Sequence, residues 1–154
     1  MTKPNVYAAI DICRGGYELT VIVDDDSGKI SIEVEAEFHP FGTTYLSNLL
    51  EKIATFGVVC SVSLDRWQPQ LCRDVETSGF KVFEAPLGIS AHRQMVDRVA
   101  YACRAGVFKD GRIYFTDMFF DDKGRRREKN ATILWAFNAF HKSREPVIKF
   151  VGEL

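Results

Sequence analysis

The chain lacks the features that mark membrane, secreted or repeat proteins. No apolar run approaches the ~18 residues that a membrane-spanning helix needs, and the polar residues 1–4 form no signal peptide. No linker, repeat or low-complexity segment divides the 154 residues. These absences predict one soluble globular domain, residues 1–154, with no membrane partner. Its expected location is the cytoplasm, which is the host cell cytoplasm if the protein is viral.

The cysteine spacing excludes a second class, the small zinc-binding domains. No two of the four cysteines form a C-x-x-C pair, the spacing on which structural zinc sites are commonly built. Three of them lie among apolar residues, which is typical of reduced core cysteines in a cytoplasmic protein. The four residues are Cys13, Cys60, Cys72 and Cys103.

One short apolar stretch, residues 6–13, organises the rest of the chain. It carries a single carboxylate, Asp11, and Gly15 and Gly16 follow it, so the stretch is predicted to be a central β-strand. A carboxylate inside a buried strand is costly unless something pairs with it. Asp11 therefore either caps the turn at Gly15 or binds a cation at an open strand end.

A second strand with the same design favours the cation. Residues 58–64 are mostly apolar, as expected of an interior parallel strand, and Asp65 follows them directly. If the two strands lie parallel and adjacent, Asp11 and Asp65 emerge at the same edge of the sheet. Carboxylate oxygens converging in this way are the usual ligands of hard divalent cations.

The remaining hydrophobic patterns predict an α/β fold with a mixed sheet. Residues 17–23 and 30–38 alternate in polarity and complete an antiparallel meander of three strands. Parallel strands then alternate with helices. The order matches the ribonuclease H-like fold, in which the fourth strand lies beside the first. Helices are expected over about 43–56, 69–78, 90–105 and 130–141, a short strand over 80–83, an extended segment over 112–120, and a strand-like or simply packed tail over 147–151.

Three consecutive segments read SLDRWQPQ at 63–70, VETSGF at 75–80 and VFEAPLG at 82–88. Together they resemble the nuclease domain of phage large terminase subunits. In that family a strand ends in an Asp followed by an aromatic, and a helix leads to a Gly-Phe pair and a short strand. A Gly-containing loop then precedes a long helix with a Met, here Met95. The resemblance covers residues 6–141 and implies a metal-dependent endonuclease that cuts concatemeric viral DNA during genome packaging.

The resemblance also implies a site. Asp11 and Asp65 fall on the first two acidic positions of the family, where they would be catalytic and bind two Mg²⁺ or Mn²⁺ ions. The family places a third Asp at the start of the last helix, but residues 130–132 read Asn-Ala-Thr here. Asn130 either coordinates through its amide oxygen or serves as an ordinary N-cap.

Other acids could replace the missing ligand, although none has the family spacing. Glu128 lies two residues before Asn130, and Glu18 lies across the glycine turn from Asp11. Glu18 is either a metal-site carboxylate or a solvent-facing strand residue. The departure leaves three explanations open: a substituted ligand, a naturally degenerate nuclease or an engineered replacement. The remaining acids of this region are Asp117, Asp121 and Asp122.

Basic residues are concentrated in one stretch, although the net charge of −1 gives no overall attraction to nucleic acid. These side chains either neutralise DNA phosphates or belong to a solvated loop. His92 is expected to be exposed and inert, and Trp67 to anchor a helix onto the sheet rather than to stack on a base. The basic residues are Lys123, Arg125, Arg126, Arg127 and Lys129.

The chain carries no G-x-x-x-x-G-K-[ST] phosphate loop, whereas full terminases carry an ATPase with this motif. The expected partners are therefore double-stranded DNA and a separate packaging ATPase or portal. Two alternatives to the terminase-like endonuclease remain. One is a catalytically degenerate ribonuclease H-like domain that binds DNA or another protein, and the other is a nuclease resembling Holliday-junction resolvases.

Overall fold

A computed structural model describes residues 2–13, 16–38 and 43–153. Its five-stranded sheet has the order β3-β2-β1-β4-β5, with β1 to β3 antiparallel and β1, β4 and β5 parallel. The predicted mixed sheet is thereby confirmed. The predicted turn at Gly15 and the end of the meander at His39 and Pro40 fall outside the described residues. The strands are β1 (Asn5–Cys13), β2 (Gly16–Asp24), β3 (Ile30–Phe38), β4 (Val58–Asp65) and β5 (Val82–Ala85).

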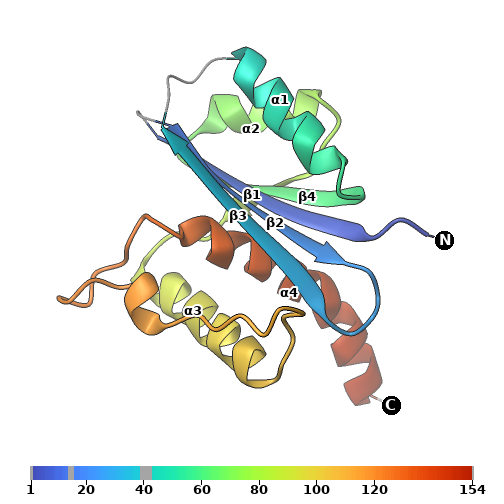
Figure 1. The fold of residues 1–154 in the computed structure, drawn as a ribbon, viewed down its shortest axis with the longest axis vertical. Coiled ribbons are helices and arrows are strands. Elements are labelled where there is room, and N and C mark those ends of the chain that lie inside the picture. Colours follow the sequence, from blue (N-terminus) through green and yellow to red (C-terminus); the bar gives the residue numbers. More distant parts are fainter. Residues whose placement is uncertain (1, 14–15, 39–42, 154) are drawn as a thin grey trace.

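Helices cover both faces of the sheet (Figure 1). On one face lie α1 (Thr43–Ala54) and α2 (Pro69–Thr77), and on the other lie α3 (Ile89–Arg104) and α4 (Ala131–Glu153). A short 3₁₀-helix, η1 (Thr116–Met118), stands between α3 and α4. None of the helices in the described ranges is long and apolar enough to cross a membrane.

The alternation of side chains along β1 decides which layer each residue faces. Val6, Ala8 and Ile10 belong to the apolar core beneath α1 and α2. Tyr7 and Ala9 belong to the core beneath α3 and α4. Because successive strand residues point to opposite faces, Asp11 projects to the face that α3 and α4 cover.

Helix α4 is fastened to the far end of β2 by a partly buried ion pair. Arg144 donates a hydrogen bond from Nη2 to Oδ2 of Asp24 at 2.6 Å, and the Asp24 side chain is only 6% exposed. The guanidinium of Arg144 also lies 4.4 Å from the ring centroid of Phe140. This contact fixes α4 along the sheet, so that its first residues reach the end at which Asp11 lies.

The structure corrects three predicted elements. Residues 112–120 form a loop and η1 rather than an extended segment, because Tyr114 and Phe119 bury their rings in the core beneath α3 and α4. The tail is helical, since α4 runs to Glu153 past the proline at 146. A short apolar run such as 147–151 does not distinguish strand from helix. The fifth strand is displaced to Val82–Ala85.

Candidate metal centre

Three carboxylates occupy neighbouring positions across β2, β1 and β4. Asp11 pairs with Glu18 in the antiparallel register. In the parallel register Ala9 pairs with Ser63, and the same register carried two residues further brings Asp11 beside Asp65. All three side chains project to the face that α3 and α4 cover. Their neighbours along each strand belong to the core on the opposite face, and successive strand residues point to opposite faces.

The neighbouring charges make ionisation of Asp11 unfavourable. Its pKa is raised to about 6, first by burial and then by the negative charges of Glu18, Asp65 and Glu128. A half-buried carboxylate surrounded by like charges is stabilised either by a proton or by a cation. Near neutral pH, therefore, this position favours the binding of a positive ion.

Glu18 is already committed to the N-terminus of α4. Its carboxylate accepts hydrogen bonds from the backbone amides of Asn130 at 2.9 Å and Thr132 at 3.2 Å, and from the Thr132 hydroxyl. The Thr132 hydroxyl also lies 2.9 Å from that of Thr20 on β2. Of the two alternatives for Glu18, the solvent-facing one is wrong, because this side chain caps a helix and complements the positive end of its dipole.

Asn130 lies at the expected boundary of the last helix, but its side chain does not cap it. The residue has a φ of 71°, a left-handed conformation that asparagine tolerates. Its Nδ2 donates to the carbonyl of Met118 at 3.4 Å, while Glu18 accepts from its backbone amide. The N-cap interpretation is wrong for the side chain, since a residue far away in the sequence provides the acceptor.

Asp11 and Asp65 line a cleft of about 190 Å³. Gln68 lines the same cleft, and its Nε2 donates to the carbonyl of Ile12 at 2.8 Å. Its Oε1 is buried and has no hydrogen-bond partner among the described residues. Buried acceptors without a protein partner are commonly hydrogen-bonded to water. The other lining residues are Ile12, Pro86, Leu87, His92, Arg126, Arg127, Glu128, Ala131 and Trp135.

The residues at this cleft fit a hard divalent cation. Their donors are carboxylate and amide oxygens, the raised pKa of Asp11 reports unbalanced negative charge, and Gln68 offers an unused acceptor. The set is small, however. Within the described ranges, no three Asp, Glu, His or Cys side chains stand together so that they could hold one ion.

The structure divides the basic residues into two groups. Arg126 and Arg127 line the cleft beside Asp11 and Asp65. Arg125 instead donates from Nε to Asp121 at 2.8 Å. Lys123 and Lys129 are exposed and are not part of the cleft lining. Positive charge next to the carboxylates therefore comes from Arg126 and Arg127.

Two aromatic side chains lie differently from their predicted positions. His92 is buried rather than exposed, with its Nε2 2.8 Å from the carbonyl of Phe119. Burial lowers its pKa, so that the ring is neutral near pH 7. Trp67 is 72% exposed, and it therefore does not anchor α2 to the sheet.

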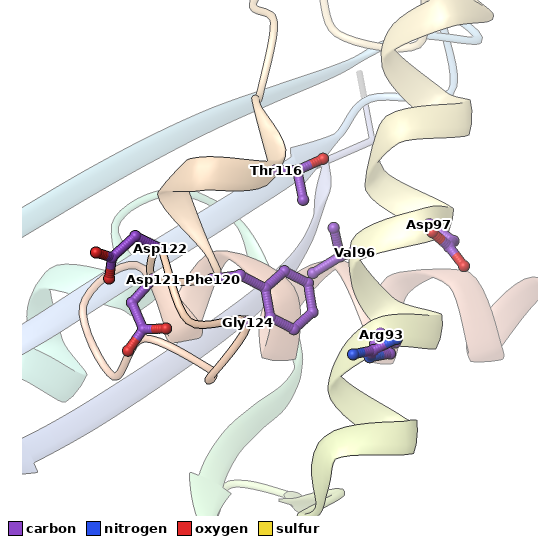
Figure 2. Close-up of a pocket in the computed structure, with 8 residues that line it drawn as sticks. All are labelled: Arg93, Val96, Asp97, Thr116, Phe120, Asp121, Asp122 and Gly124. Atoms are coloured by element: carbon purple, nitrogen blue, oxygen red, sulfur yellow. The ribbon is translucent and has the colours of Figure 1, made fainter.

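A larger hollow of about 510 Å³ lies between α3 and the segment that follows it (Figure 2). Figure 2 shows Asp121 and Asp122 on one side of Phe120, and Arg93 and Asp97 on the other. The Asp121 carboxylate accepts hydrogen bonds from Arg125, which lower its pKa. Its negative charge is thus satisfied, in contrast to that of Asp11, and the smaller cleft is the better candidate for a cation.

This sheet order, with helices on both faces and acids on adjacent strands at one end, defines a ribonuclease H-like fold. Comparison with solved structures narrows the class: the fold is that of the nuclease domains of phage large terminases. No protein-family model matches the chain, and no curated protein is significantly similar to it.

Three solved structures illustrate the likeness. The large terminase of bacteriophage HK97 is 15% identical with a TM-score of 0.65, over 90% of this chain and 40% of that one. The magnesium-bound large terminase nuclease of thermophilic phage G20c is 13% identical with a TM-score of 0.56, over 86% and 78%. The manganese-bound nuclease domain of bacteriophage SPP1 g2p is 9% identical with a TM-score of 0.51, over 88% and 86%.

Proposed function

We propose that this chain is a metal-dependent DNA endonuclease domain of the terminase type. The observation that supports this function best is the environment of Asp11. Its pKa is raised to about 6 by burial and by Glu18, Asp65 and Glu128, at a cleft whose lining includes two arginines. Nuclease domains of the same fold have been solved with magnesium and with manganese.

In this proposal Asp11 and Asp65 hold Mg²⁺ or Mn²⁺, ions that lower the pKa of water and stabilise charge on a phosphodiester. Arg126 and Arg127 bind the negatively charged DNA backbone at the mouth of the cleft. The unused Oε1 of Gln68 accepts a hydrogen bond from water in the cleft. Glu18 positions α4 and its loop through its hydrogen bonds to the helix N-terminus.

A direct test incubates supercoiled plasmid with Mn²⁺ and compares the wild type, Asp11→Asn and Asp26→Asn. Asp26 is a matched control because it lies in the β2–β3 turn with a φ of 64°, which asparagine also adopts. Nicking by the wild type and Asp26→Asn, but not by Asp11→Asn, supports the proposal. In parallel, Mn²⁺ should raise the Tm of the wild type but not that of Asp11→Asn. Absence of both effects would refute it.

The second candidate is a catalytically degenerate relative that binds DNA or another protein. It is favoured by one observation: the described residues hold no cluster of three potential metal ligands, and Glu18 is occupied at α4. Retention of plasmid in a mobility shift assay, without nicking at any concentration of Mn²⁺, would support this candidate instead.

Participation in DNA packaging forms part of the same proposal. The chain spans 40% of the length of the HK97 large terminase, so any activity of a whole terminase would need further protein. A separate packaging ATPase or portal would supply the motor. Affinity purification of the chain from cells that also express such an ATPase would test this association. Retention of the ATPase on the purified chain would support it.

A further inference from the structure

The segment between β4 and α2 runs next to the cleft. Asp65 and Gln68 both line it, and Arg66 and Trp67 lie between them in the chain. The backbone amide of Trp67 donates to Oδ1 of Asp65 at 2.9 Å, and Gln68 is tied to Ile12 on β1. Hydrogen bonds on either side therefore fix the backbone of Arg66 and Trp67 between two residues that line the cleft, and we call this pair the Arg66–Trp67 rim.

The side chains of this rim point away from the protein core. Trp67 is 72% exposed, and the guanidinium carbon of Arg66 lies 5.3 Å from the centroid of its indole. Exposure of a tryptophan has a cost, because the indole is a large apolar surface. An exposed indole with a cation beside it has the chemistry that binds an unpaired base and its phosphate.

The Arg66–Trp67 rim and the loop that carries Arg126 and Arg127 belong to opposite layers of the fold. Figure 1 shows α2 on one face of the sheet and the loop between η1 and α4 on the other. Arg126 and Arg127 belong to that loop and line the cleft together with Asp65 and Gln68. His92 and Trp135 line the cleft but are buried, whereas Trp67 is exposed. A DNA strand over the cleft would thus meet a cation from each layer and the exposed ring of Trp67.

We propose that the Arg66–Trp67 rim binds single-stranded DNA, with an unpaired base stacked on Trp67 and the adjacent phosphate near Arg66. The inference rests on DNA binding at this cleft and not on cleavage. Bases in a continuous duplex are stacked on one another, so they cannot use the ring. The rim would therefore direct the site to frayed or single-stranded segments.

Two measurements in EDTA test the rim without any cleavage. Anisotropy of dye-labelled oligonucleotides gives the affinity of every variant, and quenching of tryptophan fluorescence shows whether bound DNA contacts the rim. The wild type is titrated with oligothymidylate and with the same strand paired to oligoadenylate. Trp135 is buried, so quenching that is lost in Trp67→Phe identifies Trp67 as the reporter. Trp67→Leu should weaken binding of the single strand by about 5- to 150-fold. Its affinity for the duplex should change less than about twofold, and Trp67→Phe should keep most of the single-strand affinity.

Tyr101→Ala is the matched control, because Tyr101 is an aromatic residue of similar exposure, 69%, near the C-terminal end of α3. This variant should bind both DNA forms as the wild type does. The proposal is overturned if Trp67→Leu binds the single strand as tightly as Trp67→Phe, or if it loses single strand and duplex equally. Because the assay contains no divalent metal, a failed nicking experiment leaves this result unaffected.

Discussion

Glu18 on β2 accepts hydrogen bonds from both the backbone amide and the hydroxyl of Thr132 on α4. The contact joins the strand next to Asp11 to the helix that borders the cleft. One carboxylate thereby caps the helix and, through its charge, raises the pKa of the neighbouring acid. Structure and electrostatics of the site are coupled through Glu18.

Replacement of Glu18 should destabilise the fold. Glu18→Ala removes the acceptor of two backbone amides and one hydroxyl, which should lower the free energy of unfolding by about 1–3 kcal/mol. Urea denaturation provides the measurement. Glu33→Ala, an exposed acid on the edge strand β3, should change stability by less than about 0.5 kcal/mol. Equal losses in the two variants would contradict the capping role.

The raised pKa of Asp11 predicts an unusual dependence of stability on pH. Because the folded state binds the proton more tightly than the unfolded chain does, this group stabilises the protein below pH 3.8, and the contribution is lost as the pH rises through about 6. In EDTA at pH 7, Asp11→Asn should therefore be more stable than the wild type by about 1–2 kcal/mol. Urea denaturation at pH 7 and near pH 4 measures the difference.

The difference between Asp11→Asn and the wild type should disappear near pH 4, where the wild-type carboxyl is protonated in the folded state. Asp26→Asn should track the wild type at both pH values. A variant Asp11→Asn that is less stable than the wild type at pH 7 would show that the carboxylate has a protein partner, against the proposed cation site.

The two groups of arginines should behave differently towards DNA. Replacing both Arg126 and Arg127 by Ala should weaken duplex binding and make the slope of log K against log salt about 2 units shallower, because each phosphate contact contributes ~0.9. Arg125→Ala should leave the slope nearly unchanged, since Arg125 pairs with Asp121. Fluorescence anisotropy over a range of salt concentrations gives the slopes, and identical slopes for both variants would argue against the assignment.

A third acid should be most effective at position 131. Ala131 lines the cleft, whereas the Asn130 side chain bonds to Met118 and Thr132 bonds to Glu18 and Thr20. Ala131→Asp should lower the Mn²⁺ concentration needed for half-maximal stabilisation by tenfold or more, a gain of ~1.4 kcal/mol. Thermal melts in Mn²⁺ measure it. Thr132→Asp is the control and should destabilise the fold, so greater metal affinity in this variant would contradict the geometry.

The adjacency of Asp11 and Asp65 was predictable because it follows from periodicity. Asp65 ends its short apolar strand and Asp11 lies two residues before the end of its own. The order of helices and strands places those strands side by side in parallel. The fold could be predicted for the same reason, since patterns with a period of two or 3.6 residues persist over whole elements. The roles of these two acids in binding a metal remain predictions.

Other features of the site depend on contacts between distant segments, which the sequence does not reveal. The cap of α4 comes from Glu18, more than a hundred residues earlier, so the nearer Asn130 was a natural but wrong choice. The burial of His92 on α3 depends on the packing of the distant segment that contains Phe119. The exposure of Trp67 depends likewise on how its loop lies against the rest of the fold. Gln68 was overlooked as well, although its place three residues after Asp65 offered a signal.

The ion pair between Asp24 and Arg144 gives β2 a second hold on α4, in addition to the cap at Glu18. A strand that contacts one helix near both of its own ends restrains the orientation of that helix. Bending of α4 would have to strain β2 along most of its length, and β2 is hydrogen-bonded throughout to the strand of Asp11. Helix α4 therefore forms a fixed side of the cleft and is not a segment that moves to open or close it.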